Sequence, residues 1–144
     1  MAFNLYPNWK QAAWQEAQTL KSLDQTTAQD GVYCALLTSG YTYNQANSFY
    51  SDLGANVIGT PLQVTNNTFN LGTPPNFAVF TGDQITFLVV NQPVAAFVLY
   101  RHNAGANTTW RLVYFCNDAT AGLPVSPAGG NVLMQWNATG IFSY

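Results

Sequence analysis

The segment VAAFVLYRHNAGANTTWRLVYFC, residues 94–116, decides the fold, and the rest of the chain is built onto it. Two apolar runs, Val94 to Tyr100 and Arg111 to Cys116, flank a polar link over residues 101–110. Each run has the length and the β-branched and aromatic content of a strand, and the link carries Gly and Asn, which tolerate positive φ. The pattern predicts a β-hairpin.

Both faces of the first run of this hairpin are apolar. Ala95, Phe97 and Leu99 alternate with a second apolar set, Val94, Ala96, Val98 and Tyr100. A strand that is apolar on both sides must be covered on both sides. We therefore expect the hairpin at the centre of a sandwich or a closed barrel, or beneath a partner subunit.

Short strands separated by turns dominate the remaining sequence. Residues 9–23 have the only helix-like periodicity, and residues 39–53 read as a loop with a short helix. Further strands are expected at residues 32–38, 57–64, 68–71, 78–80, 85–90, 132–136 and 140–144. We predict a mainly β, single-domain β-sandwich of jelly-roll or related topology over residues 1–144, with a short N-terminal helix and arm over about residues 1–25.

The composition is unusual in its lack of charge. Charged residues make up 7% of the 144 residues, against roughly 25% in typical soluble domains. A surface of neutral polar residues suits burial against other proteins, although a secreted domain that uses such residues has the same composition. The net charge of −2 and the absence of a basic cluster argue against nucleic acid as a partner.

The opening residues and the apolar runs bear on location. Residues 1–7 lack a basic stretch followed by an apolar one, so we expect no signal peptide. No apolar run approaches the roughly 18 residues of a membrane helix, so we expect no membrane partner and a chain made in the cytosol. Cys34 and Cys116 each lie in an apolar run, where free and buried thiols are favoured over a disulfide.

The sequence offers little for catalysis, and we expect no enzyme, no cofactor and no metal. It lacks the common nucleophile, phosphate-loop and zinc motifs. His102 is the only histidine, and a Cys buried in a strand is a poor nucleophile for it to activate. Asp30, Asp83 and Asp118 fall in turns, which favours backbone hydrogen bonding over a carboxylate pair for glycoside hydrolysis.

The aromatic side chains admit three interpretations: core, protein interface or a platform for sugar rings. The interface is favoured for the group, because Tyr and Trp are enriched in binding hot spots while charged residues are depleted there. We expect the N-terminal segment to leave the domain or to line its edge, and Arg101 and His102 to be loop residues or partner contacts. The predicted interface residues are Phe3, Leu5, Tyr6, Trp9, Tyr41, Tyr43, Phe49, Tyr50, Arg101 and His102. The free protein is expected to be a homo-oligomer, a dimer or a trimer.

The whole chain resembles a family of small virion proteins of tailed bacteriophages. The resemblance rests on motifs spread almost from end to end: Asn8-Trp9-Lys10, Tyr41-Thr42-Tyr43-Asn44, Phe49-Tyr50-Ser51-Asp52-Leu53, Gly59-Thr60-Pro61, Thr109-Trp110-Arg111-Leu112-Val113, the Gly- and Pro-rich residues 120–132, Trp136-Asn137 and Ile141-Phe142. These motifs are structural rather than catalytic. The Asn-rich link at residues 102–109 is where this chain departs from the pattern.

The resemblance implies a non-enzymatic capsid decoration or cement protein. Its partner would be the major capsid protein, and its location the virion capsid, assembled in the cytoplasm of the bacterial host. The alternative is a carbohydrate- or receptor-binding module of a phage tail or fibre.

Overall fold

A computed structural model describes residues 3–15, 23, 26–27, 30–71, 78–137 and 140–143 of the chain. One α-helix, α1 (Pro7–Gln15), and three 3-10 helices, η1 (Tyr50–Asn56), η2 (Asn107–Thr109) and η3 (Ala119–Ala121), accompany the strands of this part. The strands are β1 (Phe3–Leu5), β2 (Thr26–Thr27), β3 (Asp30–Leu37), β4 (Val57–Gln63), β5 (Thr68–Leu71), β6 (Ala78–Thr81), β7 (Ile85–Phe87), β8 (Ala96–His102), β9 (Arg111–Cys116), β10 (Val132–Met134) and β11 (Phe142–Ser143).

The predicted hairpin is confirmed as β8 and β9, which pair antiparallel at the centre of the largest sheet. This sheet runs β1-β9-β8-β3-β2, with β4 also paired to β3. A bulge at Val113 shifts the register, because Leu99 lies opposite Tyr114 while Tyr100 lies opposite Leu112. Both strands are buried almost throughout, as expected for a strand that is apolar on both sides.

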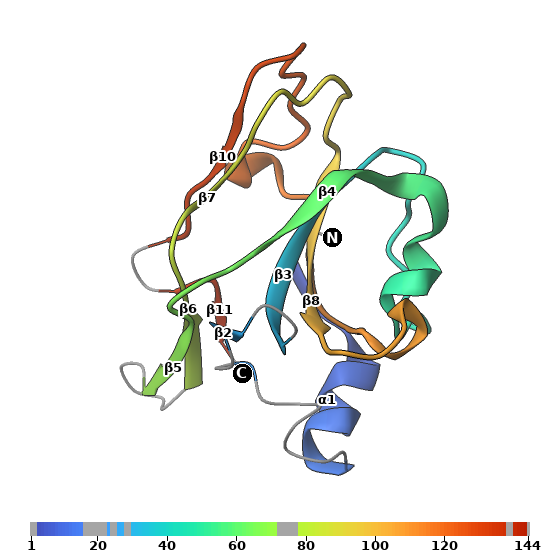
Figure 1. Ribbon diagram of the computed structural model, residues 1–144, viewed down its shortest axis with the longest axis vertical. Coiled ribbons are helices and arrows are strands. Elements are labelled where there is room, and N and C mark those ends of the chain that lie inside the picture. Colours follow the sequence, from blue (N-terminus) through green and yellow to red (C-terminus); the bar gives the residue numbers. More distant parts are fainter. Residues whose placement is uncertain are drawn as a thin grey trace.

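A second layer of strands covers one face of this sheet (Figure 1). It consists of a three-stranded sheet, β11-β6-β5, and a two-stranded ribbon, β10-β7. The rings of Tyr114 and Phe142 stack with centroids 5.2 Å apart, and those of Phe97 and Trp136 lie 5.8 Å apart, so the hairpin packs directly on this layer. The mainly β, sandwich-like fold with a short N-terminal helix is therefore as predicted.

The opposite face of the hairpin is covered by residues that precede β4. Tyr41 and Tyr43 place their rings 5.9 and 5.3 Å from that of Phe115, and Tyr50 lies 4.6 Å from Tyr100. The chain thus covers both faces of the hairpin by itself. No partner subunit is needed to bury it.

The boundaries of several elements differ from the predictions. α1 is described over Pro7–Gln15, and residues 16–22 of the predicted helix lie outside the described part of the chain. β7 ends at Phe87 rather than at residue 90, and β10 at Met134 rather than at residue 136. β8 continues through Arg101 and His102, so these two residues belong to a strand and their assignment to the link is wrong.

Candidate functional site

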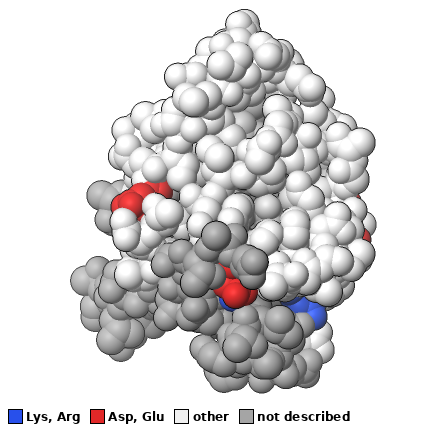
Figure 2. All heavy atoms as spheres, viewed as in Figure 1, with Lys and Arg blue, Asp and Glu red and all other residues white. Residues whose placement is uncertain are grey.

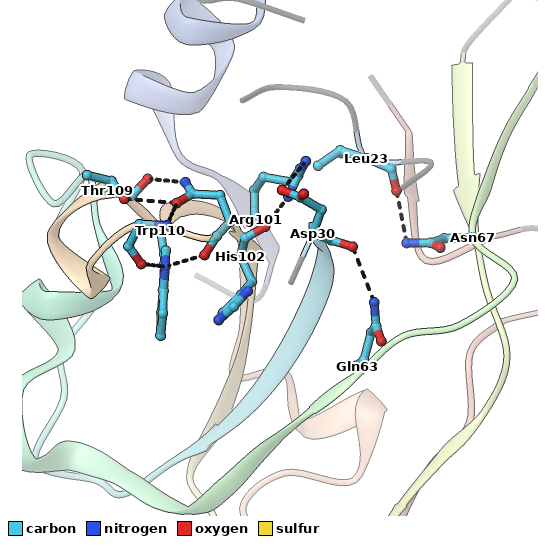
Figure 3. A network of polar contacts seen from close by, with 10 residues as sticks. Leu23, Asp30, Gln63, Asn67, Arg101, His102, Thr109 and Trp110 are labelled. Atoms are coloured by element: carbon cyan, nitrogen blue, oxygen red, sulfur yellow. Dashed lines mark hydrogen bonds and ion pairs between the residues drawn. The ribbon is translucent and has the colours of Figure 1, made fainter. Parts of the chain in front are cut away.

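Arg101 is a structural cation in the middle of the sheet. Its side chain is 1% exposed, and its Nη1 lies 3.3 Å from Oδ1 of Asp30, the first residue of β3 (Figure 3). The guanidinium also donates a hydrogen bond to the carbonyl of His102. A buried guanidinium needs such partners to offset its desolvation. Arg101 therefore joins the end of the hairpin to β3 and presents no charge to a partner.

The link between β8 and β9 is held by one buried amide. Oδ1 of Asn103 accepts hydrogen bonds from the N–H of Gly105 (2.7 Å) and from Oγ1 of Thr109 (3.1 Å), and its Nδ2 donates to the Thr109 carbonyl (3.1 Å). Nε1 of Trp110 donates to the carbonyls of Asn103 and Gly105, as Figure 3 shows in part. A Cβ on Gly105 would come within 2.8 Å of Oγ1 of Thr109, so a larger residue there would displace the side chains that hold the link. The link is a fixed structure rather than a loose loop.

Five rings form an aromatic cluster at this end of the hairpin: Tyr33, Tyr50, Tyr100, His102 and Trp110. Trp110 is central, with ring centroids 4.1 Å from His102, 5.3 Å from Tyr50 and 5.9 Å from Tyr100. Tyr100 is buried, whereas the other four rings are half-buried. The cluster therefore combines a packing role with partly accessible aromatic surface.

Four of the predicted interface residues are instead core, and the prediction is corrected for them. Tyr6, Trp9, Tyr41 and Arg101 are buried by this chain itself. The hydroxyls of Tyr6 and Tyr41 share a hydrogen bond of 2.8 Å, and burial together with that bond raises the pKa of Tyr6. The reason is that β1 pairs with β9 and places the following residues beneath the loop of residues 41–43.

Of the other six predicted interface residues, five are partly accessible, and the side chain of the sixth, Phe3, is not described. Phe3 belongs to edge strand β1. Leu5, Tyr43, Phe49, Tyr50 and His102 are half-buried. Phe49 lies under the guanidinium of Arg111, 4.7 Å from its ring centroid. The structure thus does not gather the ten predicted residues into one surface.

The turn that follows β7 exposes large apolar side chains. Leu88 is 71% exposed and Val89 is 64% exposed, and we call these two residues the apolar tip. Val89 has a φ of +51°. A β-branched residue in this region costs on the order of 1–3 kcal/mol and persists only where its surroundings impose it. Sequence analysis missed both residues, because their apolar run looked like the end of a buried strand.

Hydrogen bonds hold the apolar tip against the residues before β10. The N–H of Val89 donates to Oδ1 of Asn131 (3.1 Å), and the N–H of Val90 donates to the carbonyl of Gly130 (2.9 Å). The N–H of Gly129 returns a hydrogen bond to the carbonyl of Val90 (2.8 Å). The hydrogen bonds of Val89 and Val90 therefore hold the left-handed conformation of Val89.

A groove of about 500 Å³ lies between β4 and β7, and the apolar tip forms part of its lining. The lining contains no charged residue, and consists of Ile58, Gly59, Thr60 and Leu62 on one side and residues 86–92 on the other. β4 pairs with β3 and β7 with β10, so the groove separates the edges of two sheets. A rigid apolar projection and an uncharged hollow thus lie next to each other.

The segments that form this region carry no charged residue. The sequence has no charged residue over 84–100 or over 119–144, which together include β7, the apolar tip and β10. In Figure 2 the upper part of the visible face, where these turns lie, is free of Lys, Arg, Asp and Glu. On β10, Leu133 is 51% exposed and lies opposite Thr86 of β7, so the ribbon also turns an uncharged face outward.

Among the described residues no three His, Cys, Asp or Glu residues gather in an arrangement that suits a metal ion. Cys34 and Cys116 are free and buried, and burial raises the pKa of both thiols, which keeps them protonated and unreactive. Cys116 lies opposite Phe97, five positions along β8 from His102, so these two residues do not form a catalytic pair.

Comparison of the chain with models of protein families, with curated proteins and with solved structures found no match. In the part of the chain that the structure describes, none of the helices has both the length and the apolar character needed to cross a bilayer.

Proposed function

We propose that this chain is a non-enzymatic virion structural protein, a capsid decoration protein that binds across subunits of the major capsid protein. The observation that carries the proposal is the uncharged outer ribbon of β10 and β7, which exposes Leu133 beside Thr86. Burying neutral side chains avoids the large desolvation cost of charged ones. Such a ribbon suits a permanent protein contact better than contact with solvent.

The mechanism is burial of surface, not chemistry. Each large apolar side chain that becomes fully covered contributes about 1.5–3 kcal/mol before entropy is subtracted. A rigid sandwich loses little conformational freedom on docking, so more of this gain is retained as affinity. A decoration protein of this kind reinforces a shell by bridging neighbouring subunits.

The test is binding of the purified chain to shells of the major capsid protein from the phage that encodes it. Co-sedimentation should saturate at many copies per shell, and cryo-electron microscopy should place them on the outer surface. Leu133→Lys should weaken binding by at least about tenfold, because the lysine must be desolvated. The matched control is Thr42→Lys, which adds the same charge at an exposed residue outside the ribbon. Absence of binding by the unmodified chain would contradict the proposal.

A second candidate function, a carbohydrate-binding module of a tail or fibre, is favoured by the aromatic cluster. Its half-buried rings of Tyr33, Tyr50 and Trp110 have the character of surfaces that stack on sugars. This candidate predicts a change of tryptophan fluorescence when oligosaccharides from the host cell surface are titrated into the protein. It also predicts only a few copies per virion.

A further inference from the structure

We propose that the apolar tip and the adjacent groove form a two-fold interface between two copies of this chain. The tip of each copy would enter the groove of the other. The inference deepens the expectation that the free protein is a homo-oligomer, and it rests on the proposed function for its role in the virion. The occupant of the groove is a second copy of the same surface.

The apolar tip has the properties of a preformed anchor. Leu88 and Val89 are the two most exposed of the large apolar side chains in the described part of the chain. Their turn is fixed by the hydrogen bonds of Val89 and Val90 to Asn131 and Gly130, so it does not have to be ordered on binding. An anchor that is rigid before binding loses less entropy when it docks.

The strain at Val89 is the second argument. Glycine would adopt a φ of +51° without steric cost, yet the chain has a β-branched residue there and exposes it to water. In the isolated chain this arrangement is unfavourable both for the backbone and for the side chain. Backbone strain of this kind clusters at binding sites, and burial of the side chain in a partner accounts for it.

The groove and the tip belong to one surface, because Leu88 and Val89 form part of the groove's own lining. Its lining includes the buried side chains of Ile58 and Phe87 and the half-buried side chain of Leu62, all apolar. Because the projection and the hollow adjoin each other, a two-fold rotation can place each tip over the other groove. An isologous contact needs this kind of self-complementary patch.

The charge distribution favours a second copy. The chain has a net charge of −2, so two copies repel each other wherever charged surfaces meet. The tip, the groove and the ribbon are uncharged, and the charges visible in Figure 2 lie in the middle and lower parts of the face shown. Contact through the uncharged surface therefore avoids placing charged residues of one copy directly against those of the other.

The experiment is sedimentation velocity of the purified full chain over a concentration series in physiological salt. The unmodified chain should form a dimer. Leu88→Asp should raise the dimer dissociation constant by about 100-fold, as for loss of an interface hot spot. Thr108→Asp, which adds the same charge in the exposed η2 of the link, should leave the dimer unchanged. A monomer at every concentration, or a Leu88→Asp dimer as tight as the original, would overturn the inference.

Val89→Gly tests the strain argument with a variant that stays folded. It should weaken the dimer about tenfold, while the melting temperature of the monomer rises by about 2 °C because the backbone relaxes. A lower melting temperature together with an unchanged dimer would mean that Val89 serves the fold, and would overturn the inference.

If the unmodified chain is monomeric but still binds capsid shells, the self-interface is wrong while the proposed function stands. If the chain dimerises but does not bind capsid shells, the proposed function is wrong while the self-interface stands.

Discussion

Two turns of this molecule reverse the usual distribution of side chains. The link between β8 and β9 turns polar groups inward, since Asn103 is 7% exposed and supports the link from within. The turn after β7 turns apolar groups outward, with Leu88 and Val89 in solvent. The link is polar in sequence and structural in role, whereas the tip is apolar in sequence and contributes nothing to the core.

The difference teaches how to separate stability from binding in this chain. Polar residues that are buried and hydrogen-bonded stabilise the fold, because removing one hydrogen-bonding group leaves its buried partner unsatisfied. Apolar residues that are exposed on a rigid turn have no such explanation within the single chain. Substitutions at the hairpin end should therefore change folding, and substitutions at the tip should change association.

The largest effect should come from alkaline pH, which acts on buried groups in the hairpin and in the segments packed beside it, and not on the tip. Burial raises the pKa of Tyr6, Tyr100 and Cys34 above their values in the unfolded chain. A raised folded-state pKa stabilises the protein below the unfolded pKa, near 9 for the thiol and 10 for the phenols, and the stability falls as pH rises above these values. Three such groups give a slope of about 4 kcal/mol per pH unit near pH 11.

Urea unfolding at a series of pH values from 8 to about 11 measures this slope. Association through the uncharged tip should stay constant over the part of the series in which the chain is folded. A free energy of unfolding that stays flat above pH 10 would contradict the burial of these three groups.

The next largest effect should come from Arg101→Ala. The substitution removes the ion pair with Asp30, the hydrogen bond to the His102 carbonyl and the buried alkyl chain. We expect a loss of about 3 kcal/mol in the free energy of unfolding, read from thermal or urea denaturation. The matched substitution Lys10→Ala, at an exposed basic residue of α1, should cost far less. Equal effects would show that the burial of Arg101 does not matter for stability.

The hairpin could be predicted from sequence because its signal is local and strong. Apolar runs on both sides of a polar link predict strands that must be covered on both faces. The structure agrees, because Phe97 packs on Trp136 on one face and Phe115 packs on Tyr43 on the other. The end of β8 could not be predicted, because Arg101 and His102 look like loop residues until β3 lies beside them. Asp30 is 71 positions away in sequence, and no local pattern connects it to Arg101.

The candidate binding surface was harder to predict than the fold. The run from Ile85 to Val90 has the composition of one strand, and nothing local marks Phe87 as its last residue. Exposure of Leu88 depends on the hydrogen bonds that Asn131 and Gly130 supply from a distant part of the chain. Conversely, Tyr6 and Trp9 were predicted to be interface residues, because the sequence does not show which segments bury aromatic side chains near a chain end.

A smaller effect should come from Asn103→Ala in the link. The N–H of Gly105 and the carbonyl of Thr109 lose their partner, although both residues are exposed and gain some hydration. We expect a loss of about 2 kcal/mol in the free energy of unfolding. Asn107→Ala, at an exposed residue of the same link, is the control and should be nearly neutral. If both variants melt alike, the link is not supported from within and the contrast with the tip disappears.

The smallest effect on stability should come from Leu88→Ala at the tip. The side chain is 71% exposed, so truncation removes few contacts within the chain and leaves no cavity. We expect a change within about 0.5 kcal/mol in the free energy of unfolding, measured at a concentration where the protein is monomeric. At high concentration the same variant should melt earlier than the unmodified chain, because it loses the stabilisation that association adds to the folded state. A loss of more than about 2 kcal/mol in the monomer would be the size of a core truncation, and would mean that Leu88 packs within its own chain and that the two turns do not differ in kind.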